Sequence, residues 1–307
     1  MPAMRDVFWN QIYARAKEDR NIVVLSADFS APSLDRFRLE LPSQYIRLGI
    51  AEQNMILMAA GLALEGKRPF CYAIAPFLTM RCLEQTRLFA SGMRLPITLV
   101  GVGAGFSYAD SGYTHHALED IAQMRVLPHM QVFQPCDNAS VRAMADMLVQ
   151  SDGPAYLRLD RYGEETIAFR EETIGKGFQI VRPVRRITLA ASGYMVKTAI
   201  EAAARLEDDG IHVGVVDICR IPVDGALYDA LAPAEELVVL EEHTLPGGLG
   251  SYFLEQICGK KLPLRVHRAG LDLSDGYPEE YSSRQALHEL YQLGPGQIAQ
   301  MIKRLEN

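Results

Sequence analysis

A single glutamate, Glu52, stands at the head of a long apolar stretch. Residues 48–64 read L-G-I-A-E-Q-N-M-I-L-M-A-A-G-L-A-L, and the apolar residues after Asn54 recur at helical spacing on nearly every side. We therefore expect a buried helix that begins near Glu52. A carboxylate in such a place is costly unless it is paired, neutral or hydrogen-bonded to a ligand. The plainer alternative is a first-turn glutamate that only satisfies helix amides.

Two consecutive histidines, His115 and His116, are the second candidates for chemistry. They lie in a glycine-containing segment, residues 103–119, that reads G-A-G-F-S-Y-A-D-S-G-Y-T-H-H-A-L-E. An imidazole can hydrogen-bond and relay protons near neutral pH. Out of context, a histidine pair is equally compatible with a surface turn or a weak metal site.

Further candidates follow the ends of expected strands, where open α/β sheets place their ligands. Phe77 follows a strand at 68–74 and Asp28 follows a strand at 21–27. Phe77 alone would more readily be a core residue, and Asp28 a turn or helix cap. Arg161 and Arg5 carry guanidinium groups that match oxyanions, although both could form surface salt bridges instead.

The hydrophobic pattern alternates between buried strands and helices. Over roughly the first 160 residues it predicts a doubly wound α/β domain with a mostly parallel sheet. One of its helices is expected at 79–91. The strands of this domain are expected at 21–27, 45–48, 68–74, 97–103, 131–134 and 155–159. We assign residues 1–170 to the first domain, 171–186 to a charged, glycine-containing linker, and 187–307 to a second α/β unit.

Length and composition limit the functional classes. The chain has 307 residues, 49% of them hydrophobic and 22% charged, enough for a substantial core and two domains. A net charge of −7 argues against nucleic acid and anionic membranes as partners.

Neither a signal peptide nor a membrane span is expected, so we predict a cytoplasmic protein. The five cysteines are scattered and form no C-x-x-C pair, which favours buried reduced thiols.

Several of these segments share a resemblance to one family. The run G-I-A-E-Q-N-M, followed by A-A-G-L-A-L-E-G-K-R-P-F, resembles the pyrimidine-binding domain of the transketolase family of thiamine diphosphate enzymes. The runs F-L-T-M-R-C-L-E-Q-T-R, G-Y-T-H-H and E-E-H-T-L-P-G-G-L-G-S extend the resemblance almost to the C-terminus.

The resemblance implies roles in binding thiamine diphosphate. Glu52 would hydrogen-bond the aminopyrimidine ring at N1′ and promote proton removal from C2 of the thiazolium. Phe77 would stack on the pyrimidine ring, as offset aromatic pairs do. Ile74 and Asp28 would complete the cofactor-binding wall.

The resemblance also implies substrate contacts. His115 would face the carbonyl or hydroxyl of the donor, with His116 beside it. Arg161 and Arg5 align with arginines that contact substrate phosphate. Ser111 stands where many transketolases use an aspartate against a substrate hydroxyl, and Tyr113 replaces the usual proline. These departures put the usual pentose phosphate substrates in doubt.

One motif of the family is missing from this chain. The family holds the diphosphate and Mg²⁺ on a separate domain with a G-D-G motif, and no G-D-G occurs here. The chain is therefore expected to be the C-terminal subunit of a split transketolase without metal ligands of its own. A G-D-G-bearing N-terminal subunit would complete an α2β2 enzyme and bind most of the Mg²⁺. That enzyme would transfer a two-carbon ketol unit from a ketose, expected to be phosphorylated, to an aldehyde.

Three alternatives remain open from the sequence. One is the β subunit of a 2-oxo acid dehydrogenase E1, and another is an acyloin-forming enzyme like 1-deoxyxylulose-5-phosphate synthase. The third is a noncatalytic regulatory subunit. The Q-N-M run after Glu52 and the T-H-H loop favour transketolase, and intact Glu52, Phe77 and His115 speak against a noncatalytic chain.

Overall fold

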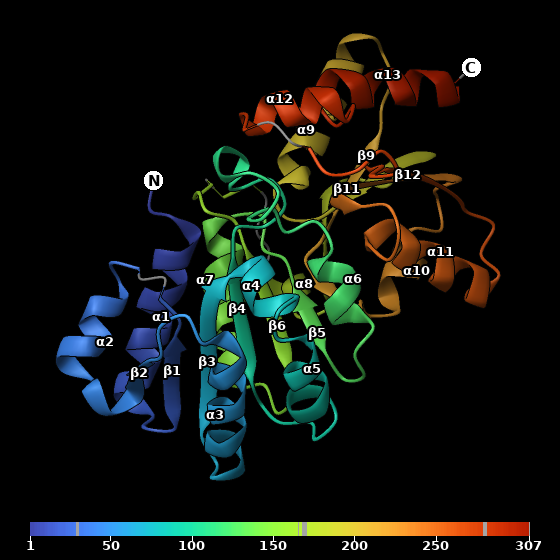
Figure 1. The fold of residues 1–307 in the computed structure, drawn as a ribbon. Helices are drawn as coiled ribbons and strands as arrows, with labels where there is room; N and C mark the ends of the chain where they lie inside the picture. Colours follow the sequence, from blue (N-terminus) through green and yellow to red (C-terminus); the bar gives the residue numbers. More distant parts are fainter. Residues whose placement is uncertain (29–30, 165, 168–170, 279–280, 307) are drawn as a thin grey trace.

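The protein consists of two α/β units, each built on one sheet with helices on both faces (Figure 1). The computed structural model describes residues 1–28, 31–164, 166–167, 171–278 and 281–306. This arrangement confirms the predicted fold class of two α/β domains with mostly parallel sheets.

The first sheet has seven strands in the order β10-β5-β6-β4-β3-β1-β2. All neighbours in it are parallel except β10, which runs antiparallel to β5. Central β3 matches the expected strand residue for residue. The strands are β1 (Ile22–Ser26), β2 (Tyr45–Arg47), β3 (Arg68–Ile74), β4 (Thr98–Val102), β5 (Gln131–Phe133), β6 (Ala155–Leu159) and β10 (Arg220–Ile221).

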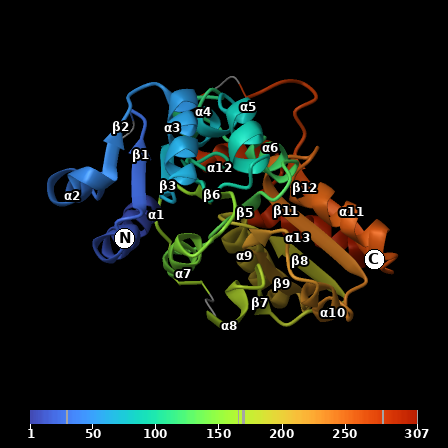
Figure 2. The same ribbon diagram turned by 90° about the horizontal axis from the view of Figure 1, so that it is seen from below.

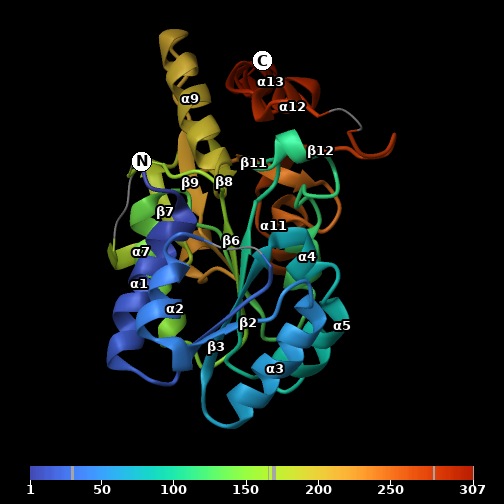
Figure 3. The same ribbon diagram turned by 60° about the vertical axis from the view of Figure 1, so that its left-hand side comes forward.

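Helices cover both faces of this sheet (Figures 2 and 3). One face carries α1 (Met4–Glu18) and α7 (Asn138–Val149), packed through an aromatic cluster that includes Trp9 and Phe8. A short α2 (Leu34–Glu40) and η1 (Pro42–Gln44) follow β1. The opposite face carries α3 (Glu52–Leu64), α4 (Ala75–Thr79), α5 (Leu83–Gln85), η2 (Thr86–Ser91) and α6 (Asp120–Arg125).

Two local expectations on this face were wrong. The helix expected at 79–91 is broken into α4, α5 and a π-helical η2, and Arg81, which bonds Glu52, lies between α4 and α5. Helix α3 is not buried on nearly every side. Met55, Ile56 and Ala59 face the sheet, while Leu57 is exposed because no described element of this chain covers the outer face.

The second sheet has the order β12-β11-β8-β9-β7. Its strands are β7 (Phe178–Arg182), β8 (Ile187–Ala191), β9 (Gly214–Ile218), β11 (Glu236–Thr244) and β12 (Arg265–Leu271). Residues 171–186, expected as a linker, contain α8 (Glu171–Ile174) and β7, which pairs antiparallel with β9. The segment is therefore an integral part of the second unit, because β7 pairs with β9 and forms the edge strand of that sheet.

Two helical layers enclose the second sheet. Helices α9 (Met195–Asp208), α12 (Arg284–Leu290) and α13 (Pro295–Glu306) pack on one face. Helices α10 (Ala226–Ala230) and α11 (Leu249–Lys260) lie on the other. No helix in the described part of the chain is both long and apolar enough to cross a bilayer.

Candidate functional site

Glu52 is the first residue of α3 and is almost completely buried, with 4% of its surface exposed. Its carboxylate accepts a hydrogen bond at 2.7 Å from Nη1 of Arg81. The buried acid is thus paired, as expected for a carboxylate removed from water. It does not act as a side-chain cap of its own helix, because that N-cap lies at Ala51 and no side-chain cap bond is formed.

A cavity of about 370 Å³ opens beside Glu52. Its walls combine apolar side chains with this one buried carboxylate. The lining residues are Ala27, Asp28, Ile50, Glu52, Ala73, Ile74, Phe77 and Arg81. Apolar walls with a few placed polar groups suit a flat organic ring that must be held in one orientation. The predicted cofactor residues Glu52, Phe77, Ile74 and Asp28 are therefore brought together.

Arg81 connects the acid to the aromatic wall and was missed as a site residue from the sequence. Its guanidinium carbon lies 4.8 Å from the ring centroid of Phe77 while Nη1 bonds Glu52. This is a cation–π contact combined with an ion pair. The available signal was the run F-L-T-M-R, in which Arg81 follows Phe77 by four residues.

His115 contacts the same aromatic ring. Its ring centroid lies 5.2 Å from that of Phe77, at an interplanar angle of 71°. Nδ1 of His115 shares a hydrogen bond of 2.9 Å with the Thr114 hydroxyl, which orients the ring. Nε2 makes no hydrogen bond to any described residue. The imidazole is half-buried, and its second nitrogen is available to a ligand.

The loop that carries His115 depends on two glycines. Gly103 and Gly105 have φ of +99° and +54°, and a Cβ on Gly105 would collide with the carboxylate of Glu242. The N–H of Ala117 donates to the Gly105 carbonyl at 3.1 Å and closes the loop. Close approach to β11 therefore fixes where the loop leaves the sheet.

A cationic rim adjoins this loop. The Arg161 guanidinium lies 4.9 Å from the Tyr108 ring centroid, and Tyr108 lies 6.3 Å from the His115 ring. Burial raises the pKa of the Tyr108 phenol, and the nearby charges of Arg161 and Arg5 oppose that rise. Both predicted arginines are thus close enough to Tyr108 to act on it.

The Arg161 guanidinium forms an ion pair with the carboxylate of Asp110 in this structure. Nη1 of Arg161 lies 3.3 Å from each carboxylate oxygen of Asp110, and Ser111 donates to the same carboxylate at 3.2 Å. Arg161 holds the pKa of the exposed Asp110 carboxyl below its usual value, although partial burial opposes this. Ser111, in η3 (Ala109–Ser111), therefore contacts a protein carboxylate at the rim.

His116 is separated from the cavity and is the one predicted substrate residue that the structure places in the core. It is 2% exposed and packs edge-on against Phe106 at 5.1 Å. Burial lowers its imidazole pKa. Of the two histidines, it is His115 that contacts Phe77 at the cavity wall. Asp28 lies at the cavity rim, bonded to Arg47 at 2.9 Å.

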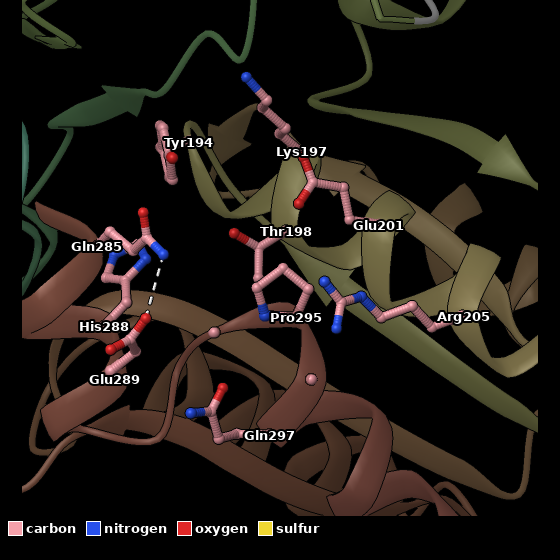
Figure 4. Close-up of a pocket in the computed structure, with 12 residues that line it drawn as sticks. Tyr194, Lys197, Thr198, Glu201, Arg205, Gln285, His288, Glu289, Pro295 and Gln297 are labelled. Carbon is pink, nitrogen blue, oxygen red and sulfur yellow. Dashed lines mark hydrogen bonds between the residues drawn. The ribbon is translucent and has the colours of Figure 1, made fainter.

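A larger cavity, about 500 Å³, lies in the second unit between α9, α12 and the start of α13 (Figure 4). Most of its charged groups already have partners. Lys197 bonds Glu164 at 3.2 Å, His288 bonds Glu242 at 2.5 Å, and Gln285 bonds Glu289 at 3.1 Å. This cavity has a greater volume than the one at Glu52, but the cavity at Glu52 is the one that combines a buried carboxylate with an aromatic wall.

The described residues contain no group of three or more His, Cys, Asp or Glu side chains placed to hold a metal ion. Four of the cysteines are buried free thiols as expected, and Cys258 is exposed.

Comparison with known proteins identifies the family. The transketolase pyrimidine-binding domain matches residues 1–163, and the transketolase C-terminal domain matches residues 176–298. The chain belongs to the transketolase family. Membership implies thiamine diphosphate as cofactor and confirms the resemblance inferred from the sequence.

Relatives of similar length include transketolase subunits. A subunit of the apulose-4-phosphate transketolase of Phocaeicola vulgatus is 31% identical and covers 95% of this chain and 92% of that protein. The 6-deoxy-6-sulfo-D-fructose transketolase subunit SqwH of Clostridium sp. strain MSTE9 is 34% identical over 87% of this chain and 84% of that protein. A solved split-gene transketolase, described as an inactive β4 tetramer, has 32% identity and a TM-score of 0.85 over 99% and 98% of the two chains.

Longer proteins are also similar to this chain. 1-Deoxy-D-xylulose-5-phosphate synthase of Synechococcus sp. strain CC9605 is 32% identical over 98% of this chain, which spans 47% of that protein. This transketolase chain thus corresponds in extent to a subunit of a split enzyme.

Proposed function

We propose that this chain is the C-terminal subunit of a two-subunit transketolase that transfers a two-carbon ketol unit from an anionic ketose to an aldehyde. One observation carries the proposal. The buried carboxylate of Glu52 and the ring of Phe77 line one cavity, and the His115 imidazole packs on Phe77 from the loop side. An acid, a stacking wall and a proton-transferring group are thereby gathered in one place.

The cavity fits the aminopyrimidine end of thiamine diphosphate. Its apolar walls match a flat ring, and Glu52 supplies a carboxylate that can bond a ring nitrogen. When bound, thiamine diphosphate supplies an acidic carbon whose anion attacks carbonyl groups. Glu52 orients the ring and holds a proton at a ring nitrogen, while Ile74 and Phe77 exclude water. Arg81 balances the charge of the buried acid.

His115 and the cationic rim act on the substrate. The unpaired Nε2 of His115 can hydrogen-bond a substrate carbonyl or hydroxyl and move a proton at that oxygen. Arg161 and Arg5 recognise the anionic end, because guanidinium groups match tetrahedral oxyanions. The names of two relatives contain a sugar phosphate and a sulfo-sugar, and both are oxyanion-bearing ketoses. Binding of such an anion at Arg161 would displace Asp110.

The partner subunit is proposed to supply the diphosphate and Mg²⁺ sites through a G-D-G motif, in an α2β2 assembly in the cytoplasm. An apolar face of this chain supports a docking role. Seven large apolar side chains are exposed on α3 and the neighbouring loops and short helices. They are Ile50, Leu57, Met58, Leu64, Met80, Leu88 and Met93. Such a face next to a cavity is typical of a protein interface.

Calorimetry tests the proposal directly. Thiamine diphosphate with Mg²⁺ is titrated into this chain alone and into its mixture with a candidate G-D-G-bearing subunit. Tight binding in the mixture only supports a split enzyme. Tight binding to this chain alone would place the diphosphate site here and refute the proposal that a partner subunit supplies it. No binding to this chain or to the mixture would favour a noncatalytic subunit.

Exchange of the C2 proton tests Glu52 within the active mixture. Glu52→Gln should slow hydrogen–deuterium exchange at C2 by about 10²- to 10⁴-fold, the usual range for one acid–base group. Glu65→Gln, at the exposed opposite end of α3, is the matched control and should leave exchange unchanged. Near-normal exchange in Glu52→Gln would contradict the assigned role.

The second candidate function is acyloin formation from a 2-oxo acid, favoured by the similarity to 1-deoxy-D-xylulose-5-phosphate synthase. The two reactions differ in the group released from the donor. A 2-oxo acid releases carbon dioxide, whereas a ketose releases an aldehyde. Assay of the assembled enzyme with pyruvate, with detection of carbon dioxide, therefore separates them.

A further inference from the structure

A segment of the second unit lies over the loop that carries His115. After β12 the chain makes three separate contacts with residues 109–119. The N–H of Ser282 donates to the Ala109 carbonyl at 3.3 Å. The Tyr281 ring packs so closely on Gly112 that an added Cβ would lie 3.2 Å from it.

Tyr277 makes the third contact, and it makes it in two ways. Its ring stacks on Tyr113 with centroids 5.6 Å apart and planes 21° from parallel. Its hydroxyl donates to Oε1 of Glu119 at 2.5 Å. The bond to Glu119 raises the pKa of the Tyr277 phenol to about 12. A hydrogen bond to a carboxylate is stronger than one between neutral groups.

These two contacts bracket His115 in the chain. Tyr113 precedes it by two residues and Glu119 follows it by four. Between them the backbone is held by tight turns, in which the N–H of His115 donates to Gly112 at 3.0 Å and that of His116 donates to Tyr113 at 3.3 Å. Tyr277 therefore fastens both ends of the turn that presents the imidazole to Phe77.

We propose that Tyr277 is a positioning residue for His115, supplied by the second unit and acting through Tyr113 and Glu119. This inference rests on the proposed function, because it assumes that His115 meets the substrate. It gives the second unit a part in the active site besides assembly. A small displacement of a group that acts on substrate lowers turnover substantially.

Three variants separate the contacts. Tyr277→Phe removes only the bond to Glu119, and Tyr277→Leu removes the bond and the stacking. Tyr281→Phe is the matched control, since the Tyr281 hydroxyl bonds no described residue. In the assembled enzyme we expect kcat to fall about threefold in Tyr277→Phe and at least tenfold in Tyr277→Leu, with C2 exchange unchanged in both.

A double-mutant comparison distinguishes positioning from general destabilisation. If Tyr277 acts through His115, Tyr277→Leu should lower kcat little further in a His115→Ala background. A structural defect would lower kcat by the same factor in both backgrounds, and would also lower C2 exchange. Either result would overturn the proposal.

A second readout needs neither cofactor nor partner. Histidine-selective ¹³C-labelled protein gives imidazole signals, and His115→Ala assigns the signal of His115. Tyr277→Leu should shift or broaden the signal of His115, and Tyr281→Phe should not. An unchanged His115 signal would refute the positioning role. Absence of C2 exchange in the wild-type assembly would instead refute the proposed function.

Discussion

Substitution of Arg284 by methionine should destabilise the protein severely at neutral pH. Arg284 begins α12 and bonds carboxylates from two units. Its Nη2 and Nε donate to Glu242 at 2.6 and 2.8 Å, and its Nη1 donates to Asp160 at 2.6 Å. The three side chains are 13%, 2% and 8% exposed. Asp160 directly precedes Arg161, so the pair also anchors the cationic rim.

The expected cost follows from this burial. Removing one partner of a buried ion pair costs about 3–5 kcal/mol, because the remaining charge is left uncompensated. Methionine keeps most of the apolar stem, but it removes the guanidinium whose carbon lies 3.6 Å from the Tyr194 ring centroid, so the loss also includes a cation–π contact. His288 still bonds Glu242 at 2.5 Å, which favours the lower half of the range. We expect a loss of about 3 kcal/mol at pH 7.

The loss should depend on pH in a defined direction. Burial opposes the charge on Glu242, but Arg284 and His288 outweigh it and hold the pKa of this carboxyl well below its usual value. In the wild type this group stabilises the fold above its unfolded pKa, and that contribution is lost as pH falls through the lower folded pKa. Without Arg284 the burial effect dominates, so the difference between variant and wild type should shrink toward pH 4.

Urea unfolding at pH 7 and pH 4.5 measures both quantities. Arg38→Met is the control, because Arg38 and its partner Asp35 are 63% and 65% exposed, and such pairs contribute about 0–1 kcal/mol. A loss in Arg284→Met no larger than in Arg38→Met would refute the reasoning. So would a difference that grows toward acidic pH.

Three other outcomes are expected. His115→Ala should lower turnover of the assembled enzyme about 10²-fold or more while leaving C2 exchange largely intact, and unchanged turnover would remove His115 from the reaction. Arg161→Ala should raise KM for an anionic ketose about 10- to 100-fold, the worth of one charge-assisted hydrogen bond, whereas Asp110→Asn should lower KM by freeing the guanidinium. Equal changes in KM for an uncharged sugar would contradict recognition of the anion by Arg161. Burial raises the pKa of Asp217 from 3.8 to about 7, so its contribution to the unfolding free energy is lost as pH rises between these values. Asp217→Asn should flatten that slope in urea titrations, and an unaltered slope would mean that other groups cause it.

Much of the fold was encoded in local patterns. Strand 68–74 was predicted with its observed bounds, and the start of α3 at Glu52 agrees with the apolar run that follows it. These features depend on side-chain periodicity within a few turns or strand residues, which a linear sequence displays directly. The family was also readable there, because its motifs are short and contiguous.

Other parts of the site depended on contacts between distant residues. The resemblance assigned the donor contact to His115 and set His116 beside it, but the tertiary structure places His116 in the core, where it packs against Phe106. The outer face of α3 was also predicted to be buried, and the structure leaves it exposed. An apolar sequence pattern does not distinguish a face covered by the same chain from one that another chain would cover.

The sequence by itself determined which groups could do chemistry: a carboxylate at a helix start, an aromatic ring after a strand and a histidine in a glycine loop. Tertiary structure alone decided that Arg81 pairs with Glu52, that Asp110 pairs with Arg161, and that Tyr277 contacts the loop of His115. The last two contacts join residues 51 and 158 positions apart. Such pairings are set by how sheets and loops pack in space, and no local propensity records them.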